Sequence, residues 1–125
     1  AMSGGILVVD DNDHLRTILA TLLAHMGYES IFAENGEEAI KKTVSRIPEL
    51  VLLDLGLPDL PGEAVVRAIK RNPTTAQIPI VGCSAYSMGE ETESAFREGL
   101  AAYLQKPFRL GLFQQTIEQF VARPR

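Results

Sequence analysis

Cysteine, tryptophan and long apolar runs are scarce or missing in this sequence. Its 125 residues include one cysteine, Cys83, and no tryptophan. A lone cysteine excludes an internal disulfide and is typical of a reducing compartment, which predicts a cytoplasmic location. No apolar run reaches the roughly 18–20 residues that cross a membrane, and the first residues lack the basic and apolar segments of a secretory signal. We therefore expect no membrane association.

A strong charge of one sign is missing as well. Against 12 Lys and Arg there are 16 Asp and Glu, a net charge of −4, which argues against direct nucleic-acid binding. The apolar fraction of 46% is that of a globular protein, and the length supports one core. We expect a tag remnant or disordered start at residues 1–4, one domain at 5–122 and a tail at 123–125.

Short apolar runs alternate with amphipathic patterns along the chain. The apolar stripe of the first predicted helix has the spacing of one helix face and contains Leu15, Ile18, Leu19, Leu22, Leu23 and Met26. Gly27 is expected to end this helix, and Asn35 to cap the next one. Strands are predicted at 6–9, 28–33, 49–54, 78–83 and 101–105.

Five strand–helix units predict an α/β fold with a doubly wound, five-stranded parallel sheet. Right-handed crossovers place helices on both faces of such a sheet. The flavodoxin-like (βα)5 arrangement with strand order 2-1-3-4-5 is the natural interpretation, although the order itself is borrowed from known folds of this kind.

Four of the apolar runs end in polar residues that do not suit a core. Asp10 and Asp11 follow the first run, Asp54 the third, Ser84 the fourth and Lys106 the fifth. The carboxyl ends of neighbouring parallel strands meet at one edge of the sheet, where ligands bind. The sequence therefore predicts that three carboxylates, a hydroxyl and an amine converge at one site.

The residue types of this group favour phosphoryl chemistry with a hard cation. Clustered carboxylates repel one another, and Mg²⁺, with Mn²⁺ as a substitute, offsets that repulsion through oxygen ligands. No His or Cys with ligand spacing accompanies them, which disfavours zinc. Asp54, directly before a loop, is the candidate nucleophile toward phosphorus. Lys106 would supply a second positive charge and Ser84 a hydrogen-bond donor.

Simpler interpretations exist for single residues. An aspartate after a strand is often a helix cap or a turn residue, but this does not explain why Ser84 and Lys106 end neighbouring strands. Asp13 is interpreted as a charge in the first helical turn and Asp59 as a loop residue. His14 and His25 are interpreted as exposed helix residues and Cys83 as a small strand residue.

At these motifs the chain resembles the response-regulator receiver family of two-component signalling, over about residues 5–122. ILVVDDNDHLR resembles the family's opening strand and acidic pair, and LVLLDLGLPDLPG its phosphorylation-site strand and loop. CSA within VGCSAYS resembles the hydroxyl step, and AYLQKPF the lysine step. The four motifs occur in order at receiver-like spacing, which makes the resemblance specific.

The resemblance implies a role for each matching residue. Asp54 would be the phosphoacceptor, and Asp11 a direct Mg²⁺ ligand, with Asp10 nearby or acting through water. Asp54 and the backbone carbonyl of Gly56 would complete the protein ligands. Lys106 would contact the phosphoryl group.

Other implied roles concern the response to phosphorylation. The Lys106–Pro107 peptide would be cis and Ser84 would move toward the phosphoryl group. Tyr103 would change rotamer, although plain packing is a serious alternative for it. Two departures from the family pattern are a leucine, Leu57, where many members have methionine, and the pair Gly56 and Tyr86. That pair would border the water that hydrolyses the acyl phosphate and would set the lifetime of the phosphorylated state, with no prediction of whether this lifetime is long or short.

The resemblance implies a phosphorylation-controlled switch rather than a turnover enzyme. A partner histidine kinase or phosphotransfer protein would phosphorylate Asp54, and the surface of the fourth helix, fifth strand and fifth helix would then favour a different partner or a dimer. An aspartate-nucleophile phosphohydrolase is a second hypothesis, but such enzymes carry D-x-D where this chain has Gly56. A phosphorylation-independent binding module is a third, against which the intact Asp, Ser and Lys set argues.

Overall fold

Five strands alternate with five helices in the part of the chain that the structure describes. The structure is a computed structural model, and it describes residues 4–85 and 89–122. The strands are β1 (Ile6–Val9), β2 (Ser30–Ala33), β3 (Leu50–Asp54), β4 (Ile80–Ser84) and β5 (Ala102–Gln105). The helices are α1 (Asp13–His25), α2 (Gly36–Arg46), α3 (Gly62–Arg71), α4 (Glu90–Glu98) and α5 (Leu110–Phe120).

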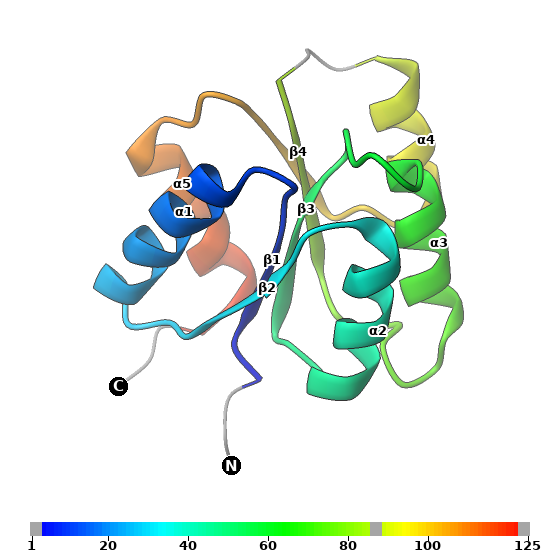
Figure 1. Ribbon diagram of the computed structural model, residues 1–125, viewed down its shortest axis with the longest axis horizontal. Coiled ribbons are helices and arrows are strands. Elements are labelled where there is room, and N and C mark those ends of the chain that lie inside the picture. The colour runs from blue at the N-terminus through cyan, green and yellow to red at the C-terminus, as the bar shows by residue number, and fades with distance from the viewer. Residues whose placement is uncertain (1–3, 86–88, 123–125) are drawn as a thin grey trace.

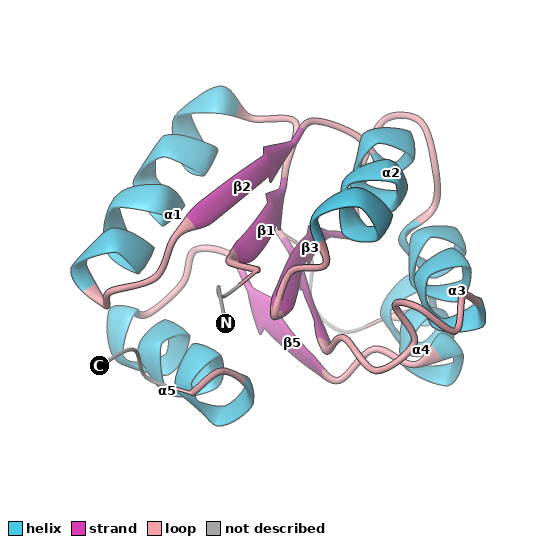
Figure 2. Ribbon diagram, turned by 90° about the horizontal axis from the view of Figure 1, so that it is seen from below, coloured by secondary structure: helices cyan, strands magenta, loops and turns pink. Residues whose placement is uncertain are grey.

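The strands form one parallel sheet in the order β2-β1-β3-β4-β5. Helices α1 and α5 cover one face of the sheet, and α2, α3 and α4 cover the other (Figures 1 and 2). This is the doubly wound, flavodoxin-like arrangement, so the predicted fold class and strand order are confirmed. The arrangement follows from the right-handed crossovers between parallel strands.

Two apolar cores lie on the two faces of the sheet, because successive strand residues point to opposite sides. In β1, Leu7 and Val9 pack with residues of α2, α3 and α4, whereas Ile6 and Val8 pack with α1 and α5. All four residues are at most 1% exposed. Burial on both faces explains why this strand is a continuous apolar run rather than an alternating one.

The predicted end of the first helix and the predicted cap of the second helix are both found in the structure. Asn35 accepts a hydrogen bond from the Glu38 amide, and Gly27, with φ of 91°, follows the end of α1. The second strand begins at Ser30, two residues later than predicted, because the Tyr28 amide instead donates to the Leu23 carbonyl of α1 at 2.9 Å. Residues 1–3 of the predicted start lie outside the described part, whereas Gly4 is placed half-buried.

Two glycines near helix starts have opposite surroundings and give a stability prediction. A Cβ at Gly62 would lie 2.5 Å from Leu55 Cδ2 and 3.2 Å from Leu55 Cα, next to Asp54, whereas a Cβ at Gly111 would meet nothing within 4 Å. We expect Gly62→Ala to lower the free energy of unfolding by about 1–3 kcal/mol through overpacking. Gly111→Ala should raise it by about 0.5 kcal/mol through helix propensity. Urea denaturation of both variants tests this pair, and equal shifts of the same sign would contradict it.

Candidate functional site

Three carboxylates come together at the carboxyl edge of the sheet. One oxygen from each of Asp10, Asp11 and Asp54 lies within 4.8 Å of the others. They meet because β1 and β3 are hydrogen-bonded neighbours with Val9 opposite Leu53, so the residues that follow arrive at the same level. Asp10 and Asp54 are buried, at 2% and 7% exposure, whereas Asp11 is exposed and leaves the group open to solvent.

Lys106 reaches into this group from the end of β5. Its Nζ donates to Asp10 Oδ2 at 2.8 Å and lies 3.4 Å from Asp54 Oδ2. The peptide bond between Lys106 and Pro107 is cis, and the Lys106 amide donates to the Ser84 carbonyl at 2.8 Å. Burial opposes the charge on Lys106, but the hydrogen bond to Asp10 and the charges of Asp54 and Asp10 together raise its pKa above the ordinary value.

The charged form of Asp54 is less well stabilised by its surroundings than the charged form of Lys106. Burial is the main cause that raises the pKa of Asp54, and the Asp10 charge adds to it. The Gly56 amide, which donates to Asp54 Oδ1 at 2.9 Å, and the charge of Lys106 only partly oppose this rise in pKa. The Lys106 ammonium pairs with Asp10 and Asp54, while the exposed Asp11 adds a third carboxylate to the group. The remaining negative charge and the oxygen-only donor set fit a hard divalent cation.

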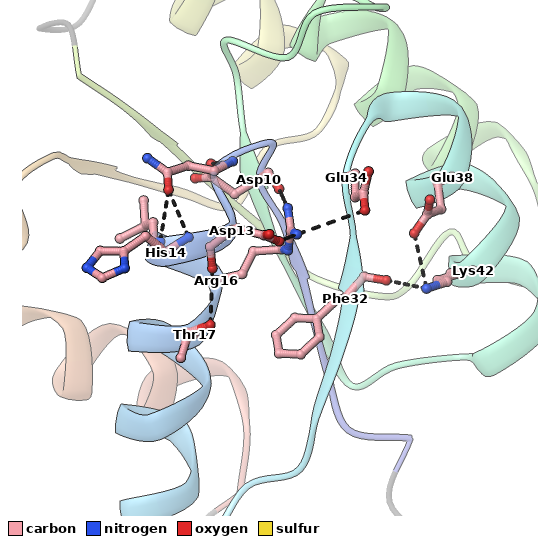
Figure 3. A network of polar contacts seen from close by, with 11 residues as sticks. Asp10, Asp13, His14, Arg16, Thr17, Phe32, Glu34, Glu38 and Lys42 are labelled. Atoms are coloured by element: carbon pink, nitrogen blue, oxygen red, sulfur yellow. Dashed lines mark hydrogen bonds and ion pairs between the residues drawn. The ribbon is translucent and has the colours of Figure 1, made fainter.

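The loop that carries Asp10 and Asp11 is held by Arg16, a residue that the sequence interpretation missed. The buried Arg16 guanidinium donates to the Asp10 carbonyl at 2.6 Å and pairs with Asp13. Figure 3 shows these side chains together near the start of α1. Glu34 faces the same guanidinium at 4.0 Å. One sequence signal existed: a basic residue in the second half of the first helical turn is unfavourable for the helix dipole and requires another partner.

Ser84 and Tyr103 occupy different positions relative to the carboxylates. Ser84 ends β4 and is 8% exposed; it follows Cys83, whose partner across the sheet is Asp54. Tyr103 in β5 is half-buried and packs against the core on the α2–α3–α4 face. Gly56 lies exposed in the loop after β3, and Tyr86 lies outside the described residues. The burial of Tyr103 fits a packing role, and its switching role stays a prediction.

Asp59 does more than the loop position assigned to it from sequence. Its carboxylate accepts the Gly36 amide at 2.8 Å and the Glu37 amide at 3.0 Å, so a residue of the β3–α3 loop caps helix α2. The hydrogen bond from Gly36 is the main reason why the pKa of Asp59 is lowered. No local pattern could have revealed this contact, because the partners are 23 and 22 residues apart.

The lowered pKa of Asp59 gives a pH-dependent stability prediction. Its contribution is complete above the unfolded carboxyl pKa of about 3.9 and is lost as the pH falls through the lower, folded value. Because Asp59 is exposed, the Asp59→Asn variant should lose no more than about 1 kcal/mol at pH 7. Denaturation curves from pH 7 to pH 2 should show the two proteins converging in acid. A difference that stays constant over this range would contradict the prediction.

Comparison with known proteins identifies the family. The model of the response regulator receiver domain matches residues 6–118. The chain belongs to the response regulator receiver domain family. The polar-differentiation response regulator DivK of Brucella anthropi is 29% identical over 120 residues, which cover 96% of this chain and 98% of DivK.

Solved structures agree with this assignment. The chemotaxis protein CheY4 of Vibrio cholerae superposes with a TM-score of 0.87 and 25% identity, covering 97% of this chain and 100% of that one. The receiver domain of the sensor histidine kinase PA1611 from Pseudomonas aeruginosa, which has a magnesium ion coordinated in its active site cleft, gives a TM-score of 0.86 and 25% identity. That match covers 95% of this chain and 98% of the PA1611 domain.

Membership places the carboxylates in a functional context. Receiver domains are signalling domains of two-component systems that bind Mg²⁺ at an acidic pocket and interact with histidine kinases or phosphotransfer proteins. In this receiver domain the carboxylates of Asp10, Asp11 and Asp54 form an acidic cluster whose oxygens lie close enough together to hold a metal ion. Across the described ranges, no helix is both long and apolar enough to cross a membrane.

Proposed function

We propose that this receiver domain accepts a phosphoryl group on Asp54 from the histidine of a kinase or phosphotransfer protein in the cytoplasm. The observation that carries the proposal is the convergence of Asp10, Asp11 and Asp54 within 4.8 Å, with Lys106 paired to two of them. Asp11, Asp54 and the Gly56 carbonyl would hold Mg²⁺ directly, and Asp10 through water. Mn²⁺ would substitute, because it prefers the same oxygen donors.

Phosphoryl transfer to Asp54 needs little covalent chemistry from the protein. A carboxylate oxygen of Asp54 forms the new bond to phosphorus while the P–N bond of phosphohistidine breaks, and the leaving imidazole nitrogen keeps the electron pair. The bound cation would supply neutralisation of charge on the carboxylate and phosphoryl oxygens. The raised pKa of Lys106 keeps its amine protonated for contact with the phosphoryl group. Ser84 donates its hydroxyl to a phosphoryl oxygen.

The response to phosphorylation would pass to the α4–β5–α5 surface. The Lys106 amide bonds to the Ser84 carbonyl, so the ends of β4 and β5 are coupled directly at the site. β5 is an edge strand, and α5 exposes Leu110 and Leu112 by 53% and 51%. Displacement of Ser84 and Lys106, with a rotamer change of Tyr103, would alter this surface for a partner or for dimerisation.

The contacts of Lys106 and Ser84 with the phosphoryl group do not by themselves provide enough free energy for a complete switch. A shift from 1% to 99% of the active conformation needs about 5.5 kcal/mol of differential stabilisation. A charge-assisted hydrogen bond from Lys106 contributes about 1.5–3 kcal/mol, and one from Ser84 about 1 kcal/mol. The balance must come from the cation and from a partner that binds the active surface preferentially. Phosphorylation and partner binding should therefore reinforce each other.

Two competing functions have weaker support. A phosphohydrolase of the D-x-D type would need an acid/base carboxylate two residues after its nucleophile, where this chain has Gly56. A phosphorylation-independent binding module would not require the partly buried lysine paired with two buried carboxylates. The lifetime of the acyl phosphate would be set by Gly56 and Tyr86, which flank the position of the hydrolytic water in this family.

A small phosphodonor tests the proposal without a cognate kinase. We expect acetyl phosphate with MgCl2 to add the mass of one phosphoryl group, and EDTA to prevent the addition; intact-mass spectrometry measures both. Beryllium fluoride with Mg²⁺ should also raise the thermal unfolding temperature. Absence of both effects would favour a binding module, and sustained turnover of a phosphomonoester would favour a phosphohydrolase.

A further inference from the structure

The loop between β3 and α3 is hydrogen-bonded to a neighbouring helix through a residue outside the carboxylate group. Asp59 receives two consecutive amide donors from the start of α2, those of Gly36 and Glu37. Its own helix, α3, begins after Pro61 and has no side-chain cap. A loop carboxylate near a helix start commonly caps that helix. Here the carboxylate binds a different helix, so the contact joins two separate segments of the fold.

A second, independent observation places the same two segments in close contact. Gly36 is buried, and a Cβ built on it would lie 2.9 Å from Val65 Cγ2 and 3.0 Å from the Cβ and Cδ1 atoms of Leu60. The start of α2 therefore fits against the β3–α3 loop and the first turns of α3 with no room for a side chain. Hydrogen bonding and packing fix the loop at the same place.

From this geometry we infer that Asp59 is a positioning residue, which holds the β3–α3 loop so that the Gly56 carbonyl is presented to the metal. The inference rests on the proposed function. The loop between Asp54 and Asp59 is short, and one end is fixed by β3 and by the Gly56 amide bond to Asp54 Oδ1. Asp59 fixes the other end. A ligand loop that is ordered before binding loses less conformational freedom when the cation arrives.

Calorimetric titration of the whole chain with MgCl2 tests this role. We expect Asp59→Ala to raise the dissociation constant for Mg²⁺ by about tenfold, which is in the range for loss of a residue that orients metal ligands. Asp59→Asn keeps one acceptor and should give an intermediate loss. The loss should persist in 0.5 M KCl (about 4 Å screening length), where distant charges contribute little. In NMR spectra without metal, the Gly56 amide resonance of Asp59→Ala should also differ in position from that of the unchanged chain.

Two control variants separate positioning from loss of helix stability and from loss of charge. Asn35→Ala removes the other cap of α2, whose side-chain oxygen accepts from the Glu38 amide of the same helix. Glu63→Gln removes one negative charge from the surface cavity that Asp59 also lines. Both should leave Mg²⁺ affinity within about twofold, as expected for residues that do not orient a ligand.

Each outcome has a distinct meaning. Weaker Mg²⁺ binding in Asp59→Ala and Asp59→Asn, but not in the controls, supports the positioning role. Unchanged affinity in both Asp59 variants, or an equal loss in Asn35→Ala, overturns it. Should Asp59→Ala fail to fold, Asp59→Asn decides the result. If Asp54→Asn binds Mg²⁺ as tightly as the unchanged chain, the proposed function itself fails, independently of Asp59.

Discussion

Asp54→Asn is expected to abolish phosphoryl uptake from acetyl phosphate in the presence of Mg²⁺. The amide has nearly the same shape as the carboxylate, so the Gly56 hydrogen bond to the side-chain oxygen can persist. It lacks the negatively charged oxygen that attacks phosphorus, and it is a weaker metal ligand. We expect the rate of uptake to fall by several orders of magnitude, as follows from loss of a nucleophile. Intact-mass spectrometry over a time course measures this rate.

Glu29→Gln is the control for this variant. Glu29 is exposed and lies directly before β2, at the edge of the parallel sheet opposite the carboxylates. Uptake by this control should stay close to that of the unchanged protein. Borohydride reduction of the acyl phosphate followed by peptide mapping should place the label on Asp54. Continued uptake by Asp54→Asn at this site would contradict the role of Asp54 as phosphoacceptor.

The convergence of the carboxylates was predictable because it depends on features that are local in sequence. The runs before Asp10 and Asp54 are apolar throughout, since β1 and β3 are buried on both faces. Parallel strands in a doubly wound sheet then place the following residues at one edge. Burial of the strands and the direction of the crossovers therefore determine the position of these side chains before any tertiary contact is known.

Arg16 and Asp59 could not be assigned in this way. Arg16 donates to the Asp10 carbonyl six residues earlier, and Asp59 accepts from the Gly36 amide 23 residues earlier, so both contacts depend on how loops are placed. Loops are where such contacts concentrate, and no sequence period marks them. Helical periodicity also identifies a face without showing whether a neighbour covers it. Ile18 belongs to the apolar stripe of the first predicted helix and is nevertheless 45% exposed.

Lys106→Met should have the largest effect on stability among substitutions at the site. The variant leaves the buried Asp10 and Asp54 without their ammonium partner while nearly preserving side-chain volume. Breaking a fully buried ion pair costs about 3–5 kcal/mol, and the 20% exposure of the Lys106 side chain reduces this to about 2 kcal/mol here. Urea denaturation at pH 7 without metal measures the loss. Lys41→Met, at a position 74% exposed, should change stability by less than about 0.5 kcal/mol.

Magnesium should reverse much of this loss. A ligand that binds only the folded state stabilises it by RT ln(1 + [L]/Kd), so the gain grows as affinity increases. In the unchanged protein Lys106 Nζ occupies Asp10 Oδ2 at 2.8 Å and competes for negative charge with the cation. Without that ammonium, Mg²⁺ should bind more tightly and stabilise Lys106→Met more than it stabilises the unchanged protein. Equal stabilisation of the two proteins by saturating MgCl2 would show that Lys106 and the cation do not share these carboxylates.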